Sequence, residues 1–153
     1  MGALVGAADR ANALADEYQR NLDRTRAQSA GRARPKVYFE EWDVPMISGI
    51  QWVSELIAIA GGDDIFPELS SKKSAKDRIV TADDVIARAP DIVIGSWCGK
   101  KFRPEKFATR PGFDTIPAVR NGRIHEIKSP LILQPGPAAL TDGLAALRAI
   151  IAG

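Results

Sequence analysis

The stretch FEEWDVPMISGIQWVSELIAIAGG, residues 39–62, decides how this sequence is organised. Its second half predicts a helix over residues 49–60, because apolar residues recur there at spacings of three and four. Ser48 and Gln51 have the spacing of a capping box at the start of that helix. The pair Gly61-Gly62 supplies its left-handed end. A polar and aromatic turn therefore leads into one short, well-delimited helix.

A strand from Lys36 to Glu41 precedes this turn, because residues 37–39 form an apolar run that suits burial on both faces of a sheet. Trp42 then lies where the strand is expected to end. In open parallel sheets, ligands bind beyond the carboxyl ends of the strands. Trp42 and its acidic neighbours Glu41 and Asp43 are therefore candidate ligand-binding residues.

The rest of the chain alternates between segments with the hydrophobic pattern of a strand and segments with that of a helix. Buried strands are expected over residues 91–96 and 123–127, and a short strand over 78–80. Helices are expected between Thr81 and Pro90 and over residues 104–108, 116–119 and 138–152, with loops over 63–76 and 129–137. This order predicts an α/β fold, with a small parallel sheet of three to four strands and helices on both faces, preceded by one long amphipathic helix.

That long helix is expected over residues 3–29, which contain no proline and carry one apolar stripe. Its length of roughly 40 Å exceeds the width of a compact domain built from the remaining chain. Part of the stripe should therefore overhang and need a cover from another lobe, a second copy or a partner, unless it is a frayed extension. We accordingly divide the chain into a helix and linker over residues 1–34 and an α/β lobe over residues 35–153.

Composition narrows the class of protein. The chain has 153 residues, 45% of them hydrophobic, and a net charge of +2 with both signs interspersed, which gives no reason to expect a nucleic-acid partner. Cys98 is the only cysteine, so an intrachain disulfide and a thiol-based metal cluster are excluded. We expect neither a membrane span nor an export signal in the chain as written, which leaves a cytoplasmic location open.

Catalytic chemistry is weakly represented. The only histidine, His125, lies inside an expected strand, and no nucleotide-binding or nucleophile-elbow spacing occurs. A small enzyme using Cys98 is the weaker alternative, because only Lys100 and Lys101 stand near it to lower its pKa. We therefore expect a binding protein rather than an enzyme, with no resident cofactor or metal ion.

The expected strand ends converge on one edge of the sheet. The candidate ligand-binding residues at that edge are Glu41, Trp42, Asp43, Trp97, Cys98, Phe102 and the loop 131–134 with Gln134. Exposed tryptophans among carboxylates and amides suit a large, rigid, partly apolar ligand that binds by stacking. A third tryptophan, Trp52, is expected in the core.

Four runs resemble a known family when taken together and in order: FEEWDVPMISGIQWVSELIAIAGGDDIF, IVTADDVIARAPDIVIGS, PAVRNGRIHEI and QPGPAALTDGLAAL. They resemble the C-terminal lobe of class III periplasmic solute-binding proteins of ABC importers, and the first run is most similar to the cobalamin-binding branch. The resemblance covers about Lys36 to the end. The 3–29 helix resembles the helix that joins the two lobes in that family.

The resemblance implies a solute-binding component for cobalamin or a related metal chelate, with an iron-siderophore or haem as alternatives. It also implies a transporter permease as partner and a periplasmic or extracytoplasmic location. Trp42 with its neighbours, Trp97 with Cys98, and the loop to Gln134 would supply half of the ligand pocket. A counterpart of the N-terminal lobe and a clear docking carboxylate are missing, so a truncated protein, or a module that self-assembles through the 3–29 helix as a homodimer, stays open.

Overall fold

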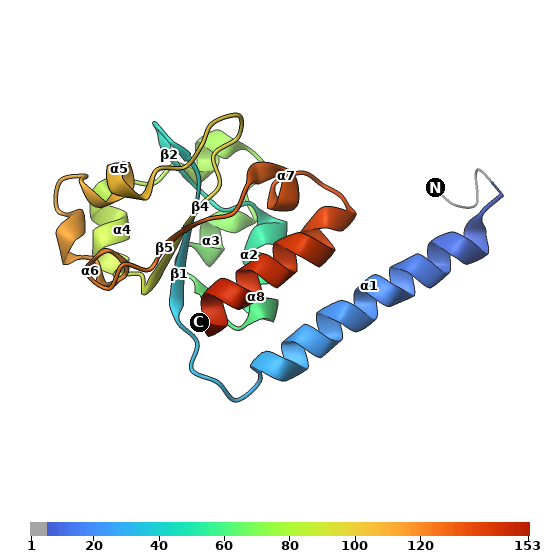
Figure 1. Cartoon of the computed structure of the whole chain (residues 1–153). Helices are drawn as coiled ribbons and strands as arrows, with labels where there is room; N and C mark the ends of the chain where they lie inside the picture. The colour runs from blue at the N-terminus through green and yellow to red at the C-terminus, as the bar shows by residue number, and fades with distance from the viewer. Residues whose placement is uncertain (1–5) are drawn as a thin grey trace.

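A five-stranded sheet forms the centre of the computed structural model, which describes residues 6–153 (Figure 1). The strands are β1 (Lys36–Asp43), β2 (Met46–Ser48), β3 (Asp63–Asp64), β4 (Ile92–Gly95) and β5 (Ile124–Glu126). Their order is β2-β1-β4-β5, and β3 pairs with the start of β1. The α/β class is confirmed, and helices cover both faces of the sheet.

The sheet is mixed rather than wholly parallel. β1 runs parallel to β3 and β4, and β4 runs parallel to β5, whereas β2 turns back and pairs antiparallel with β1. The expected turn after residue 41 is therefore a β-hairpin, and its pairing extends β1 to Asp43. The register shifts between Glu40 and Trp42, a β-bulge that gives Glu41 no direct partner. Trp42 lies inside the strand and not beyond it.

The two faces of the sheet carry separate cores, because β1 and β4 are apolar on both sides. Val37, Phe39, Ile92 and Ile94 face α2 (Gln51–Ala60) and α8 (Leu144–Ala152). Tyr38 and Val93 face the opposite layer, which contains α4 (Ala82–Arg88), α5 (Pro104–Ala108) and α6 (Pro117–Arg120). The period-two alternation of the strands thus divides their apolar residues between two cores.

The long helix α1 (Ala8–Ser29) forms an outer layer against α2 and the turn before α8 (Figure 1). Its second half is anchored, since the Asn21 amide donates to the Leu140 carbonyl at 2.9 Å and the Ser29 hydroxyl donates to the Ile59 carbonyl at 3.0 Å. Its first half projects beyond the lobe, and Leu14 there is 44% exposed. The expected overhang is confirmed, and residues 3–5 of the expected helix lie outside the described part of the chain.

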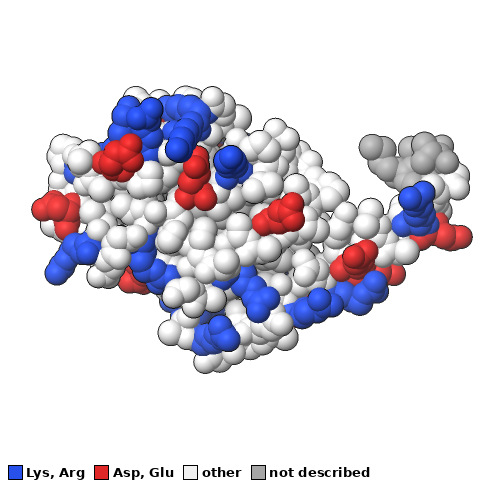
Figure 2. Space-filling model, in the orientation of Figure 1, with Lys and Arg blue, Asp and Glu red and all other residues white. Residues whose placement is uncertain are grey.

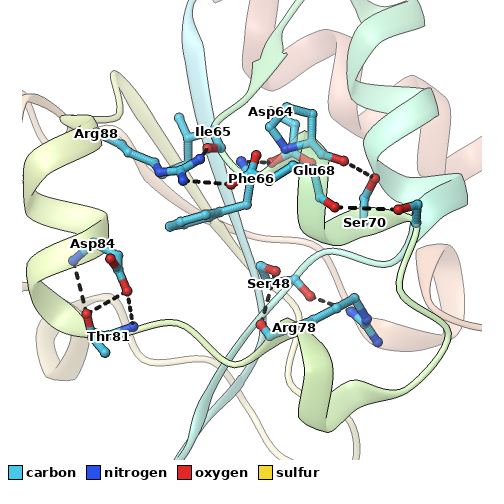
Figure 3. Close-up of polar contacts among 12 residues, drawn as sticks. Ser48, Asp64, Ile65, Phe66, Glu68, Ser70, Arg78, Thr81, Asp84 and Arg88 are labelled. Carbon is cyan, nitrogen blue, oxygen red and sulfur yellow. Dashed lines mark hydrogen bonds and ion pairs between the residues drawn. The ribbon is translucent and has the colours of Figure 1, made fainter.

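The residues that were expected to begin and end the helices do so in part. The Thr81 hydroxyl and the Asp84 carboxylate form a capping box at the start of α4, as Figure 3 shows. Gly61 ends α2 in the left-handed region at φ 98°. Ser48 does not cap α2, because it exchanges two hydrogen bonds with Arg78 instead (Figure 3).

Short helices are the main elements that sequence reasoning missed or misplaced. The expected loop over 63–76 contains β3 and α3 (Pro67–Ser70), and the expected loop over 129–137 begins with α7 (Ser129–Ile132). Each short helix has proline in its first turn, where the fixed φ of proline favours a helix rather than breaking one. The expected strand over 78–80 reduces to one bridge between Ile47 and Ile79. The last expected helix begins with a π-helical turn over Ala139–Gly143.

Within residues 6–153, no helix combines the length and the apolar character that crossing a membrane requires. The division of the chain at residue 34 stays a prediction. The structure places an extended segment between α1 and β1 there.

Candidate functional site

A depression of about 790 Å³ lies where β4 and β5 end. Residues 97–101 of the loop after β4 form one side, residues 126–130 after β5 form the other, and Gln134 completes it. Most of these residues are exposed, so the depression is open to solvent. Its place at the carboxyl ends of two parallel strands is the place where α/β sheets bind ligands.

Three of the expected site residues meet at this depression: Trp97, Cys98 and Gln134. They come from two segments that are separated by β5, three α-helices and a short 3-10 helix, and the parallel arrangement of β4 and β5 brings them together. Cys98 and Gln134 are exposed there. The strand-end argument therefore located the depression correctly.

The expectation that Trp97 offers an open stacking face is wrong. Its side chain is only 5% exposed and packs edge-on against Phe102, with ring centroids 4.9 Å apart and an interplanar angle of 73°. The indole N–H donates to the Glu40 carboxylate at 3.1 Å. Trp97 is thus part of the floor, because an indole with a buried polar partner is stable inside a core.

A buried ionic network fixes that floor, and sequence reasoning did not find it. Arg110 donates from Nη1 and Nη2 to the two carboxylate oxygens of Glu40 at 2.6 and 2.9 Å, and the Tyr38 hydroxyl donates to the same carboxylate at 3.2 Å. Glu40 is fully buried. The available signal was an acidic residue inside an apolar strand, since a fully buried carboxylate is almost always paired.

Burial raises the pKa of Glu40 because it removes water from the carboxylate, while Arg110, Trp97 and Tyr38 act in the opposite direction. The pKa of the Tyr38 hydroxyl lies well above its ordinary value, first through burial and then through the negative charge of Glu40. The network therefore holds Tyr38 neutral and places one compensated charge pair beneath the depression.

Trp42 and Asp43 lie next to the depression and contact it through Lys100. The Lys100 ammonium lies 4.0 Å from the centre of the Trp42 ring, 5.0 Å from that of Trp97 and 2.5 Å from Asp43 Oδ1. Partial burial opposes ionisation of Asp43, but the hydrogen bond and charge of Lys100 and the hydrogen bonds from backbone N–H groups together outweigh it, so the pKa of Asp43 lies below its ordinary value. Lys100 thus occupies the space between the two indoles, where a cation is stabilised by both aromatic faces.

Glu41 and Phe102 do not face the depression. Glu41 forms an ion pair with Arg78 at 2.9 Å and accepts the backbone N–H of Ile50 at 2.6 Å, which ties it to the start of α2. Burial raises the pKa of Glu41, although Arg78 lowers it in part. Phe102 is fully buried in the second core. The expected ligand contacts of these two residues are therefore not supported. The β-bulge directs Glu41 away from the depression, and Phe102 enters the core because Gly95 has no Cβ to occupy that space.

The lining of the depression is mainly basic among its charged residues. Lys100, Lys101 and Lys128 line it, against one carboxylate, Glu126, which accepts the backbone N–H of Phe102 at 3.0 Å. Figure 2 shows lysine and arginine side chains gathered over the loop after β4 and near α5. Sequence reasoning named Lys100 and Lys101 as neighbours of Cys98 but did not include Lys128, which only the pairing of β4 with β5 brings to the same depression.

Among residues 6–153, neither a metal-binding group nor His125 contributes to the depression. Within the described part of the chain, no three His, Cys, Asp or Glu side chains are grouped so as to hold a metal ion. His125 in β5 has a buried Nε2 without a hydrogen-bond partner, and burial together with Arg123 lowers its pKa. It does not line the depression.

A second hollow of about 460 Å³ lies between α1, α2 and residues 135–140 and is almost wholly apolar. Tyr18 and Leu22 of α1 face Trp52 of α2 across it, and the Trp52 indole donates to the Ile132 carbonyl at 2.8 Å. Trp52 is therefore a partly buried residue at the edge of the first core.

Comparison with known proteins identifies the architecture. The family model described as periplasmic binding protein matches residues 1–131. A comparison with curated proteins gave no match.

Among solved structures, a possible iron-binding, periplasmic solute-binding protein of Staphylococcus epidermidis superposes with a TM-score of 0.83 at 25% identity, over 99% of this chain and 58% of that one. The periplasmic vitamin B12 binding protein of Vibrio cholerae gives 0.65 at 18% identity, over 90% and 52%. A Fe3+-hydroxamate transport protein of Saccharomonospora viridis gives 0.77 at 20% identity, over 99% and 52%. The chain thus spans between about half and three fifths of the length of these proteins.

Proposed function

Because the chain belongs to the periplasmic binding protein family, we propose that it is the ligand-binding lobe of a solute-binding protein that serves an ABC importer. Its solute is a metal chelate, held at the depression after β4 and β5. The observation that carries the proposal is the position and size of that depression, since about 790 Å³ at the carboxyl ends of parallel strands falls in the range of small-molecule sites.

The depression covers one side of a ligand. Its lining residues are largely exposed, and the apolar part consists of short segments such as Ile127 and Pro130 rather than open aromatic faces. We therefore expect weak binding by this chain alone, because an open site removes less of the ligand surface from water than a closed pocket does. The partner is a transporter permease, and the location is periplasmic or otherwise extracytoplasmic.

Cobalamin, a ferric siderophore and haem are the candidate chelates. The related structures include proteins described as binding vitamin B12, Fe3+-hydroxamate and haem, which supports the class of ligand without singling out one member. Stacking on Trp42 and Trp97, which suited a large, rigid, partly apolar ligand, is less well supported because Trp97 is buried and Lys100 lies against both rings.

The test uses Cys98 as a reporter. Because it is the only cysteine and is exposed within the depression, a bound chelate should slow its reaction with a thiol reagent. Cyanocobalamin, a ferric tris-hydroxamate and haem are titrated against the chain, with binding followed by equilibrium dialysis and by the rate of Cys98 labelling. Saturable binding with matching protection of Cys98 is expected for at least one chelate. A folded chain that binds none of them at millimolar concentration, with labelling unchanged, contradicts the proposal.

Self-association through α1 is a second candidate function, favoured by the first half of that helix, which projects beyond the lobe and exposes Leu14. A second copy packed along this segment would bury its apolar stripe. The two functions are compatible, and the truncation series in the Discussion tests the second.

A further inference from the structure

The charge of the depression is set by two loops that face each other. Lys101 belongs to the loop after β4 and Lys128 to the loop after β5, so each of the two loops that line the depression contributes a lysine. Both side chains are exposed. Among the ion pairs formed by residues 6–153, none includes Lys101 or Lys128.

The other two charged residues of the lining have partners. Lys100 forms an ion pair with Asp43 at 2.5 Å and rests against the Trp42 ring, so its charge is largely balanced within the protein. The Glu126 carboxylate accepts the backbone N–H of Phe102, which ties it to the loop after β4. Lys101 and Lys128 are therefore the two cations of the lining without an ion-pair partner among the described residues, and they outnumber its one carboxylate, Glu126, whose hydrogen bond from a neutral N–H does not balance its charge.

Metal chelates of similar size differ sharply in charge. A ferric ion bound by three hydroxamates is neutral, because each hydroxamate contributes one negative charge. The same ion bound by three catecholates is trianionic, because each catecholate contributes two. Cyanocobalamin is neutral. A depression lined by two ammonium groups without ion-pair partners in the described chain and by one carboxylate has a net positive charge, and it can distinguish among these ligands by their charge.

Resting on the proposed function, we propose that the depression selects anionic metal chelates over neutral ones, with Lys101 and Lys128 as the residues that determine this preference. Each exposed charge contact is individually modest. Two of them acting on a trianion nevertheless favour it, by about tenfold in Kd at low ionic strength. The preference should weaken as salt is added, since both lysines are solvent-exposed and screened.

The experiment compares a hexadentate ferric tris-catecholate with a hexadentate ferric tris-hydroxamate on the same chain, by equilibrium dialysis with the iron measured on both sides. Labelling of Cys98 reports whether the bound chelate lies in the depression. The double variant Lys101→Glu, Lys128→Glu should remove the preference for the catecholate complex. The control Lys106→Glu reverses the charge of an exposed lysine on α5 that does not line the depression, and it should keep the preference.

The outcomes separate this inference from the proposed function. Binding of the hydroxamate complex as tightly as the catecholate complex, with Cys98 protected by both, overturns the charge preference and leaves chelate binding standing. A catecholate preference that survives in the double variant also overturns it. Failure of both complexes and of cyanocobalamin to bind a folded chain overturns the proposed function and the inference with it.

Discussion

Arg110 binds both carboxylate oxygens of Glu40 across 70 positions of sequence, with N–O distances of 2.6 and 2.9 Å. The pair joins the loop after α5 to the middle of β1. Glu40 also accepts the Trp97 indole N–H. The same carboxylate therefore connects β1 with the loop after β4 and with the loop after α5. The geometry of the depression therefore depends on a charge pair whose two residues do not line it.

Replacing Arg110 with methionine should strongly destabilise the protein. The change leaves the Glu40 carboxylate buried without a cation, and removing one partner of a buried pair costs about 3–5 kcal/mol of unfolding free energy. Arg120→Met is the matched control, since Arg120 is exposed at the end of α6 and should change stability by less than about 0.5 kcal/mol. Denaturant unfolding followed by tryptophan fluorescence measures both.

The loss of unfolding free energy caused by Arg110→Met should be smaller at lower pH. Burial raises the folded-state pKa of Glu40 above its ordinary value of 4.5, so the folded state binds this proton more tightly than the unfolded chain. Stability linked to Glu40 therefore falls as pH rises from 4.5 through the folded pKa. The variant raises that pKa further because Arg110 no longer opposes burial. Unfolding at about pH 5 and pH 7 should show a smaller deficit at the lower pH, and an equal deficit at both would contradict this assignment.

Gly95→Ala should disrupt the floor of the depression. A Cβ at this position would lie 1.9 Å from Cδ2 of Phe102, which is fully buried and packs against Trp97. Relieving such an overlap costs about 1–3 kcal/mol or more and should shift Trp97 emission to longer wavelength. Gly136→Ala is the control, because no heavy atom lies within 4 Å of its added Cβ. Similar thermal midpoints for the two variants would refute the packing argument.

Glu41→Gln should destabilise the start of α2 rather than weaken ligand binding. The amide keeps the shape of the side chain but leaves the Arg78 guanidinium, which is 3% exposed, without its counter-charge. We expect a loss of about 3 kcal/mol. Glu68→Gln removes an exposed pair with Arg88 and should cost at most about 1 kcal/mol. Equal losses in denaturant unfolding would show that burial of Arg78 is not the cause.

Two truncations distinguish the anchored and the projecting halves of α1. Removing residues 1–16 should leave the unfolding free energy of the lobe almost unchanged, since residues 8–16 of the helix are exposed. Removing residues 1–28 should destabilise it, because Leu22 packs against the first core and Thr25 is buried. Light scattering on the intact chain and on both truncations reports self-association. A monomer in all three would dispose of the assembly role, whereas a dimer lost with residues 1–16 would support it.

Local signals accounted for much of the fold. The apolar runs of β1 and β4 predicted buried strands, and the start expected at Thr81 is that of α4. The same reasoning predicted the helices that begin at Pro104 and Pro117 but failed at Pro67 and Pro130. Proline is compatible with the first turn of a helix and incompatible with its interior, and spacing alone does not say which applies. α3 and α7 were missed for that reason.

The sequence by itself determined which apolar runs form the buried strands β1 and β4 and at which edge the strands end, because hydrophobic periodicity and turn residues act over a few positions. Only the tertiary structure decided where the polar side chains at that edge point. Glu41 binds Arg78, Trp97 binds Glu40, and Lys128 lines the same depression as Lys101, and each of these relationships joins residues that are distant in the sequence. Such partners are chosen by strand register and by the need to compensate buried charge, and neither leaves a local pattern.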